Sequence, residues 1–103
     1  MDISSDHDVY LIQEIGTHRY KIGTSANIPR RLEQLQTGNS RKLILIGTCA
    51  GGREREQFLH DKFQSCRCNG GGKEWYIFDW ENQLLIFKEM DISPPENHSC
   101  PIL

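Results

Sequence analysis

Hydrophobic and polar positions along the chain follow two spacings, one typical of strands and one typical of helices. Residues 8–14 form a β-branched and aromatic run, and residues 15–18 form a turn before the shorter run 20–23. This pattern predicts a β-hairpin. Residues 42–48 and 74–78 have the same character and predict two further strands.

Three segments predict helices. Residues 28–37 begin after Asn27, which can cap a helix, carry a proline in the first turn and stop before a glycine. Residues 53–65 follow two glycines and consist largely of good helix formers. Residues 80–90 begin after Asp79, a second candidate cap. The resulting order, β-β-α-β-α-β-α, predicts an α/β domain with a small, mostly antiparallel sheet flanked by helices.

The length of 103 residues allows one domain with a modest core. We expect this domain to span residues 1–90 and a flexible C-terminal tail to span residues 91–103, which contain three of the four prolines. No apolar run approaches the roughly 20 residues of a membrane span, and the acidic start does not resemble an export signal. We therefore expect a cytoplasmic protein with no membrane association.

The net charge of −2 is unevenly distributed along the chain. Residues 1–17 carry four acidic residues and no Lys or Arg, whereas residues 18–62 carry nine basic against four acidic residues. Residues 63–103 carry three basic against six acidic residues. A basic middle suits a surface that faces phosphates, although solvated charges on any domain produce the same pattern about as often.

The four cysteines are too few and too unevenly spaced for a secreted disulfide scaffold, so we expect reduced thiols. Cys66 and Cys68 lie near His60, His98 and Cys100, and a zinc site can be drawn from them. The spacing lacks the CxxC pairs that make such an assignment strong, and we therefore expect no zinc.

Charged residues fall on two helical stripes that should face the sheet. In the first helix the spacing i, i+3, i+4 and i+7 selects Ile28, Arg31, Leu32 and Leu35. In the second helix the same spacing selects Glu56, Leu59, His60 and Phe63.

A buried carboxylate or guanidinium without a partner costs several kcal/mol. Glu56 is therefore expected to meet Arg31, a metal ion or both. The simplest interpretation is a structural Arg31–Glu56 ion pair between two packed helices. A functional interpretation is that Glu56 is a metal ligand and His60, one helical turn later, carries protons.

Five sequence blocks, taken in order, resemble the GIY-YIG endonuclease superfamily over roughly residues 8–79. Within it the chain looks closest to a compact branch found in phage and bacterial proteins and in a fungal meiotic protein. The blocks are Val9-Tyr10-Leu11, Tyr20–Ser25, Arg31–Gly38, Glu56–Phe63 and Glu74–Tyr76.

The resemblance implies that Tyr10 is the tyrosine of the first strand motif, Arg31 the helix arginine beside the scissile phosphate, and Glu56 the metal-binding carboxylate. Lys21 stands in the place of the second-strand tyrosine, and Leu35 stands where several members have a histidine. His60 is a candidate replacement for that histidine. Tyr20 or Lys21 is a candidate for the missing second-strand group.

The sequence therefore predicts an endonuclease that hydrolyses phosphodiester bonds, with DNA as the expected substrate. Glu56 would bind one Mg²⁺ or Mn²⁺ ion, since these hard ions prefer oxygen ligands. The expected catalytic residues are Tyr10, Tyr20, Lys21, Arg31 and His60. The residues expected to follow the nucleic-acid backbone are Arg30, Arg41, Lys42, Arg53 and Arg55.

Two other functions remain open. The departures at Lys21 and Leu35 favour a catalytically inactive copy that binds nucleic acid within a larger assembly. The small size and the acidic ends favour a structural or protein-interaction domain. Since no base-reading element is visible in the sequence, a partner protein is expected to supply any targeting.

Overall fold

The computed structural model describes residues 7–68 and 75–93, and its elements follow the predicted order. They are β1 (Asp8–Glu14), β2 (Arg19–Ser25), α1 (Ile28–Thr37), β3 (Leu43–Cys49), α2 (Gly52–Lys62), the 3-10 turn η2 (Gln64–Cys66), β4 (Trp75–Ile77) and α3 (Trp80–Met90). The four strands pair antiparallel in the order β3-β1-β2-β4. The predicted fold class is confirmed.

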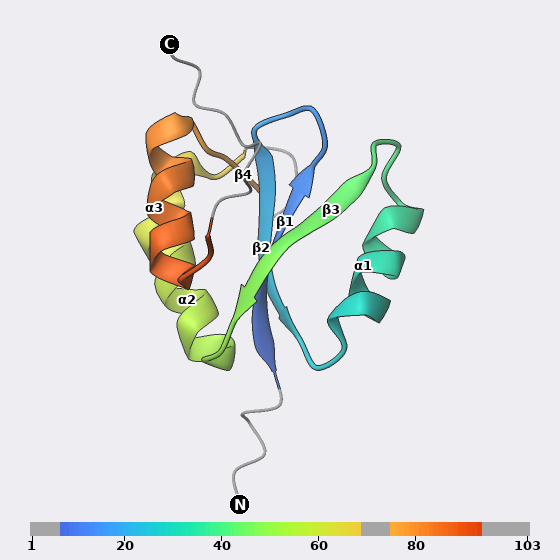
Figure 1. The fold of residues 1–103 in the computed structure, drawn as a ribbon, viewed down its shortest axis with the longest axis horizontal. Coiled ribbons are helices and arrows are strands. Elements are labelled where there is room, and N and C mark those ends of the chain that lie inside the picture. The colour runs from blue at the N-terminus through green and yellow to red at the C-terminus, as the bar shows by residue number, and fades with distance from the viewer. Residues whose placement is uncertain (1–6, 69–74, 94–103) are drawn as a thin grey trace, which may run out of the picture.

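The sheet has a helical layer on each face, with α1 on one side and α2 and α3 together on the other (Figure 1). Two separate hydrophobic cores result, because successive strand residues point to opposite faces. The larger core, under α2 and α3, contains Val9, Leu11, Tyr20, Ile22, Leu59, Phe63, Tyr76, Phe78, Ile86, Phe87 and Met90. The smaller core, under α1, contains Tyr10, Ile12, Ile28, Leu43 and Trp75.

The pairing of β2 changes partway along the strand. On one side β2 pairs with β1 over Tyr20–Ser25, with Tyr10 opposite Gly23 and Ile12 opposite Lys21. On the other side β4 pairs only with Arg19–Lys21. Within the described ranges, Ile22–Ser25 therefore have no neighbouring strand on that side. We call Ile22–Ser25 the open edge of β2.

The boundaries of α1 and α3 agree with the prediction because their caps form as expected. The Asn27 side chain accepts a hydrogen bond from the Arg30 backbone N–H at 3.2 Å. The Asp79 carboxylate accepts one from the Asn82 backbone N–H at 2.9 Å. These bonds satisfy N–H groups that have no partner inside the helix.

The predicted extent of the second helix, 53–65, is wrong at its C-terminal end. The helix ends at Lys62 and a 3-10 turn follows. The chain leaves the helical path at Phe63, whose buried ring packs on Phe78 with the ring centres 5.2 Å apart.

The start of the predicted tail is packed rather than loose. Asp91 has the left-handed backbone conformation that ends α3, and the Ile92 N–H donates to the Phe87 carbonyl at 2.8 Å. The Ile92 side chain packs against the larger core, over Gly47 of β3. The rest of the predicted tail, 94–103, lies outside the described residues. No helix in the described part of the chain is long and apolar enough to cross a membrane.

Candidate active site

The elements that carry the expected catalytic residues meet at one end of the sheet. Figure 1 shows that α1 and α2 both begin at this end, where β1 also begins and β2 finishes. Tyr10 lies in β1, Arg31 in the first turns of α1, and Glu56 in the first turns of α2.

Tyr10 lies on the α1 face of the sheet and is 1% exposed. Its hydroxyl lies over Gly23, since a Cβ atom at Gly23 would be 2.4 Å from the Tyr10 oxygen. Only glycine leaves room for the tyrosine ring at this position. The pairing of Tyr10 with Gly23 therefore brings the phenol to the open edge of β2.

Glu56 approaches the same edge from the opposite face. Thr24 Oγ1 donates to Glu56 Oε1 over 3.5 Å, and Glu56 Oε2 lies 3.7 Å from His60 Nε2. The Glu56 side chain is 17% exposed, so its carboxylate is sheltered but still reachable from solvent.

His60 fills the edge position that β4 leaves vacant. Its Nε2 lies 3.1 Å from the carbonyl oxygen of Ile22, the first residue of β2 beyond the paired stretch. A carbonyl oxygen only accepts hydrogen bonds, so Nε2 must carry a proton in this contact. The nitrogen nearest Glu56 is therefore a donor. This geometry favours a positioning role for His60 over the role of general base.

Arg31 and Glu56 do not form the expected direct ion pair in the described part of the molecule. Arg31 is half-buried, and its Nη1 donates to Gln34 Oε1 over 3.5 Å. The two residues lie on helices that cover opposite faces of the sheet (Figure 1). The interpretation of Arg31 and Glu56 as a structural ion pair between two packed helices is therefore wrong.

Lys21 lies on the same face as Tyr10, since its cross-strand partner is Ile12 of the smaller core. Lys21 is 8% exposed, and its Nζ lies 5.3 Å from the centre of the Trp75 ring. No spacing in the sequence predicts that a tryptophan of β4 contacts this lysine.

Tyr20 lies in the larger core and is fully buried. Its hydroxyl donates to Gln83 Oε1 at 3.0 Å. Burial raises the pKa of Tyr20 to about 12, so this phenol stays protonated over the pH range in which proteins are usually assayed. These features favour a packing role over the catalytic role considered for it.

The expected site residues therefore form two groups on either side of one strand end. Tyr10, Lys21 and Arg31 belong to the α1 face, while Glu56 and His60 belong to the α2 face. The groups meet at the open edge, because Tyr10 reaches Gly23 and Glu56 reaches the next residue, Thr24.

Sequence reasoning missed Thr24. Its position two residues after Ile22 is the signal that would have placed it on the α2 face.

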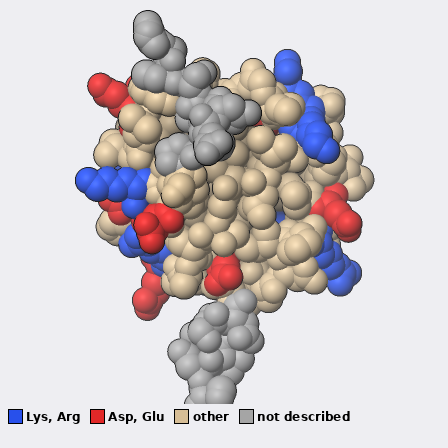
Figure 2. All heavy atoms as spheres, viewed as in Figure 1, with Lys and Arg blue, Asp and Glu red and all other residues tan. Residues whose placement is uncertain are grey.

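The five basic residues expected to follow nucleic acid do not gather in one place. Arg30 and Arg53 are exposed in the first turns of α1 and α2, at the end that carries the candidate site. Arg41 and Lys42 are exposed between the far end of α1 and β3. Much of the face over β3 is uncharged, and Lys and Arg side chains lie toward its sides (Figure 2).

Arg55 has structural partners on α3. Its guanidinium donates to the Glu89 carbonyl and lies 3.8 Å from the Glu89 carboxylate. It also lies 5.1 Å from the centre of the Phe58 ring. These contacts tie α2 to the last turns of α3 and leave Arg55 less available for phosphate than the exposed arginines.

The Glu56 carboxylate is the kind of oxygen ligand that hard divalent ions prefer. Mg²⁺ is commonly held by one or two carboxylates, with waters and substrate phosphates completing the shell. In residues 7–68 and 75–93, no group of three or more His, Cys, Asp or Glu side chains could hold a metal ion. Cys66 and Cys68 pack against different cores, and His98 and Cys100 lie outside the described residues.

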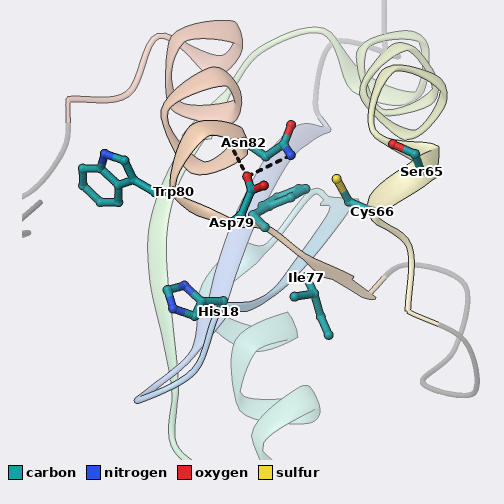
Figure 3. Close-up of a pocket in the computed structure, with 8 residues that line it drawn as sticks. His18, Ser65, Cys66, Ile77, Asp79, Trp80 and Asn82 are labelled. Carbon is teal, nitrogen blue, oxygen red and sulfur yellow. Dashed lines mark hydrogen bonds between the residues drawn. The ribbon is translucent and has the colours of Figure 1, made fainter. Parts of the chain in front are cut away.

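A hollow of about 670 Å³ lies at the opposite end of the molecule. Figure 3 shows His18, Ile77, Asp79 and Trp80 around it, where the β1–β2 turn, β4 and the start of α3 come together. None of the expected catalytic residues lines this hollow. The candidate site is therefore the open edge of β2 and not this concave surface.

A family match, together with the α/β fold, places the chain in the GIY-YIG endonuclease clan. Residues 8–91 match the T5orf172 domain, and the chain belongs to this family. No curated protein and no solved structure gives a significant match to the chain.

Proposed function

We propose that the chain is a divalent-metal-dependent endonuclease that hydrolyses phosphodiester bonds, with DNA as its substrate. One observation carries this proposal. The Tyr10 hydroxyl and the Glu56 carboxylate reach consecutive residues, Gly23 and Thr24, from opposite faces of the sheet. Membership of the GIY-YIG endonuclease clan supports the same chemistry.

Glu56 would hold one Mg²⁺ or Mn²⁺ ion, largely through water molecules. Such an ion supplies charge stabilisation at the phosphate and at the leaving 3′ oxygen. Thr24 would orient the carboxylate through its hydrogen bond to Oε1, and the His60 ring would flank Oε2 at 3.7 Å. The carboxylate would then be presented in one orientation at the open edge.

Arg31 would bind the nonbridging oxygens of the scissile phosphate. A guanidinium is planar and always charged, and it can donate two parallel hydrogen bonds to phosphate. Its hydrogen bond to Gln34 is long, at 3.5 Å, and can be exchanged for contacts with the substrate.

Tyr10 would position the attacking water or accept its proton, with Lys21 as the neighbouring cation on the same face. His60 is the weaker candidate for this step because its Nε2 already donates to the Ile22 carbonyl. The proposal therefore assigns proton transfer to the α1 face and metal binding to the α2 face.

The decisive test is the nicking of supercoiled plasmid with Mg²⁺, Mn²⁺ or EDTA. We expect metal-dependent nicking by the wild-type protein and none by Glu56→Ala, with DNA binding at low salt retained in both. Glu54→Ala is the matched control, because Glu54 is exposed on the same helix. Full activity in Glu56→Ala would remove the metal assignment.

An inactive nucleic-acid-binding copy is the second candidate, and Leu35 favours it. This side chain packs against the smaller core, where it offers no group for catalysis. Salt-sensitive binding of DNA without any nicking would support this function. A structural or interaction domain would show neither property.

A further inference from the structure

Lys21 is an almost fully buried residue that carries an ammonium group. It is 8% exposed on the face that carries Tyr10 and Ile12. A charged group taken from water is unfavourable unless the protein offers it partners. Trp75, the cross-strand neighbour of Lys21 on β4, is one such partner, since the Lys21 Nζ lies 5.3 Å from its ring centre.

The same ring is in contact with a second cation. The Arg19 guanidinium lies 4.4 Å from the centre of the Trp75 ring. Arg19 is also fixed by Glu14, at 3.4 Å, and Glu14 accepts a hydrogen bond from Asn39 at 3.1 Å. The Trp75 indole therefore contacts two cations of β2. One is Arg19, which Glu14 holds in place, and the other is Lys21, two residues later.

The position of Trp75 relates this contact to the candidate site. Lys21 is the last residue of β2 that β4 pairs, and the open edge begins at the next residue. Trp75 is 9% exposed, and its ring lies near the Lys21 ammonium where the paired part of β2 gives way to the open edge.

We propose that Trp75 is a positioning residue that holds the Lys21 ammonium beside Tyr10 at the open edge of β2. This inference rests on the proposed nuclease function, in which Lys21 assists the tyrosine. Trp75 itself would touch neither substrate nor metal. Its indole would restrict the lysine side chain to the conformation that faces the site.

The contact can be tested without cleavage, by measuring the reductive methylation of each lysine by mass spectrometry. We expect Trp75→Leu to increase the methylation rate of Lys21 about twofold to thirtyfold, the range that a cation–π contact corresponds to. Trp75→Phe keeps an aromatic face and should restore most of the protection. The exposed Lys88 gives the reference rate, and Trp80→Leu, at the start of α3, is the matched control. Unchanged protection of Lys21 in Trp75→Leu would overturn the proposal.

The catalytic consequence is measured separately, as kcat and KM for plasmid nicking. Trp75→Leu should lower kcat about tenfold or more with little change in KM, and Trp75→Phe should recover most of kcat. Loss of protection with unchanged kcat would reduce Trp75 to a packing residue and overturn the positioning role. If the wild-type protein does not cleave, the nuclease proposal fails, and the methylation rates still decide whether Trp75 holds Lys21.

A third measurement covers the case in which Trp75→Leu does not fold. In a Trp80→Phe background, Trp75 is the fluorescent indole. Lys21→Met keeps most of the side-chain volume and removes the charge, so it should shift the Trp75 emission. Lys88→Met should leave the emission unchanged. Identical spectra for the two variants would contradict the contact.

Discussion

Tyr10 combines two features that a single substitution can separate. Its ring is buried in the smaller core, and its hydroxyl lies over Gly23 at the open edge of β2. Phenylalanine keeps the ring and nearly all of the buried apolar area, but it removes the oxygen. The packing contribution and the catalytic contribution of Tyr10 can therefore be measured independently.

We expect Tyr10→Phe to melt within a few degrees of the wild-type protein and to cleave on the order of a hundredfold more slowly, the usual scale of acid–base catalysis. Thermal melting and single-turnover cleavage at saturating metal are the measurements. Wild-type cleavage by the folded variant would remove Tyr10 from the mechanism. Lys21 would then be the best remaining candidate on that face.

Tyr20 illustrates the opposite case, a tyrosine whose hydroxyl serves the fold. Burial raises the pKa of Tyr20 from 10.0 to about 12, and its hydroxyl donates to the buried Gln83. The raised pKa means that the unfolded chain loses this proton at lower pH than the folded protein. The contribution of the protonated Tyr20 to the free energy of unfolding is fully present below pH 10 and is lost as the pH rises toward 12.

Tyr20→Phe should therefore be less stable than the wild type by about 1–3 kcal/mol near neutral pH, because Gln83 loses a buried partner. The difference should shrink above about pH 10, at up to roughly 1.4 kcal/mol per pH unit. Urea unfolding from about pH 8 to 11 measures both effects. A difference that stays constant over this range would show that Tyr20 does not account for the alkaline loss of stability.

At the scale of elements, the packing of β1 on β2 depends on the absence of a side chain at Gly23. A Cβ atom there would lie 2.4 and 2.6 Å from the Oη and Cζ atoms of Tyr10. The β1–β2 pairing fixes both strands, so the tyrosine ring would have to move away from the open edge.

We expect Gly23→Ala to cost about 1–3 kcal/mol of stability, the usual penalty for overpacking a core, and to reduce cleavage as strongly as Tyr10→Phe. Gly38→Ala is the matched control, because a Cβ atom at Gly38 would meet nothing within 4 Å. That variant should change the free energy of unfolding by less than about 1 kcal/mol. Equal stability of the two variants would contradict the close approach of Tyr10 to β2.

The elements were predictable where a local signal sets them. The Asn27 and Asp79 caps determine where α1 and α3 begin, and both helices have the predicted bounds. The end of α2 was not predictable from helix propensity, because the packing of the Phe63 ring against Phe78 turns the chain before the good helix formers end. The packing of Ile92 over Gly47 also depends on a distant strand.

The candidate site was predictable in its residues but not in its arrangement. The helical stripe identified Glu56 and His60, yet it could not show that α1 and α2 cover opposite faces of the sheet. That topology excludes the direct Arg31–Glu56 pair and gives Glu56 the partners Thr24 and His60. The contact of Trp75 with Lys21 is likewise a cross-strand contact that no local spacing encodes.

At the scale of the whole molecule, the exposed arginines and lysine that are expected to follow nucleic acid form two groups, one toward each end of α1. Arg30 lies at the end where α2 also begins, and Arg53 is exposed in the first turn of α2 (Figure 1). Arg41 and Lys42 follow the other end of α1. The ten residues of α1 span about 15 Å from one end of the helix to the other. A phosphate held at the open edge of β2 would be close to the first group.

The salt dependence of DNA binding distinguishes the two groups. Each phosphate contact contributes about 0.9 to the slope of log K against log salt, since each contact releases counterions from the duplex. We expect the double variant Arg30→Ala/Arg53→Ala to lower this slope by about two, and Arg41→Ala/Lys42→Ala to leave it nearly unchanged. All four side chains are exposed, and each double variant removes two positive charges. The two variants therefore have the same net charge. Fluorescence anisotropy with a labelled duplex, in EDTA to prevent cleavage, gives the slopes. An equal decrease of the slope in both variants would mean that DNA lies along the whole length of α1. The substrate would then approach the open edge across the largely uncharged face over β3 and not from the end of the molecule.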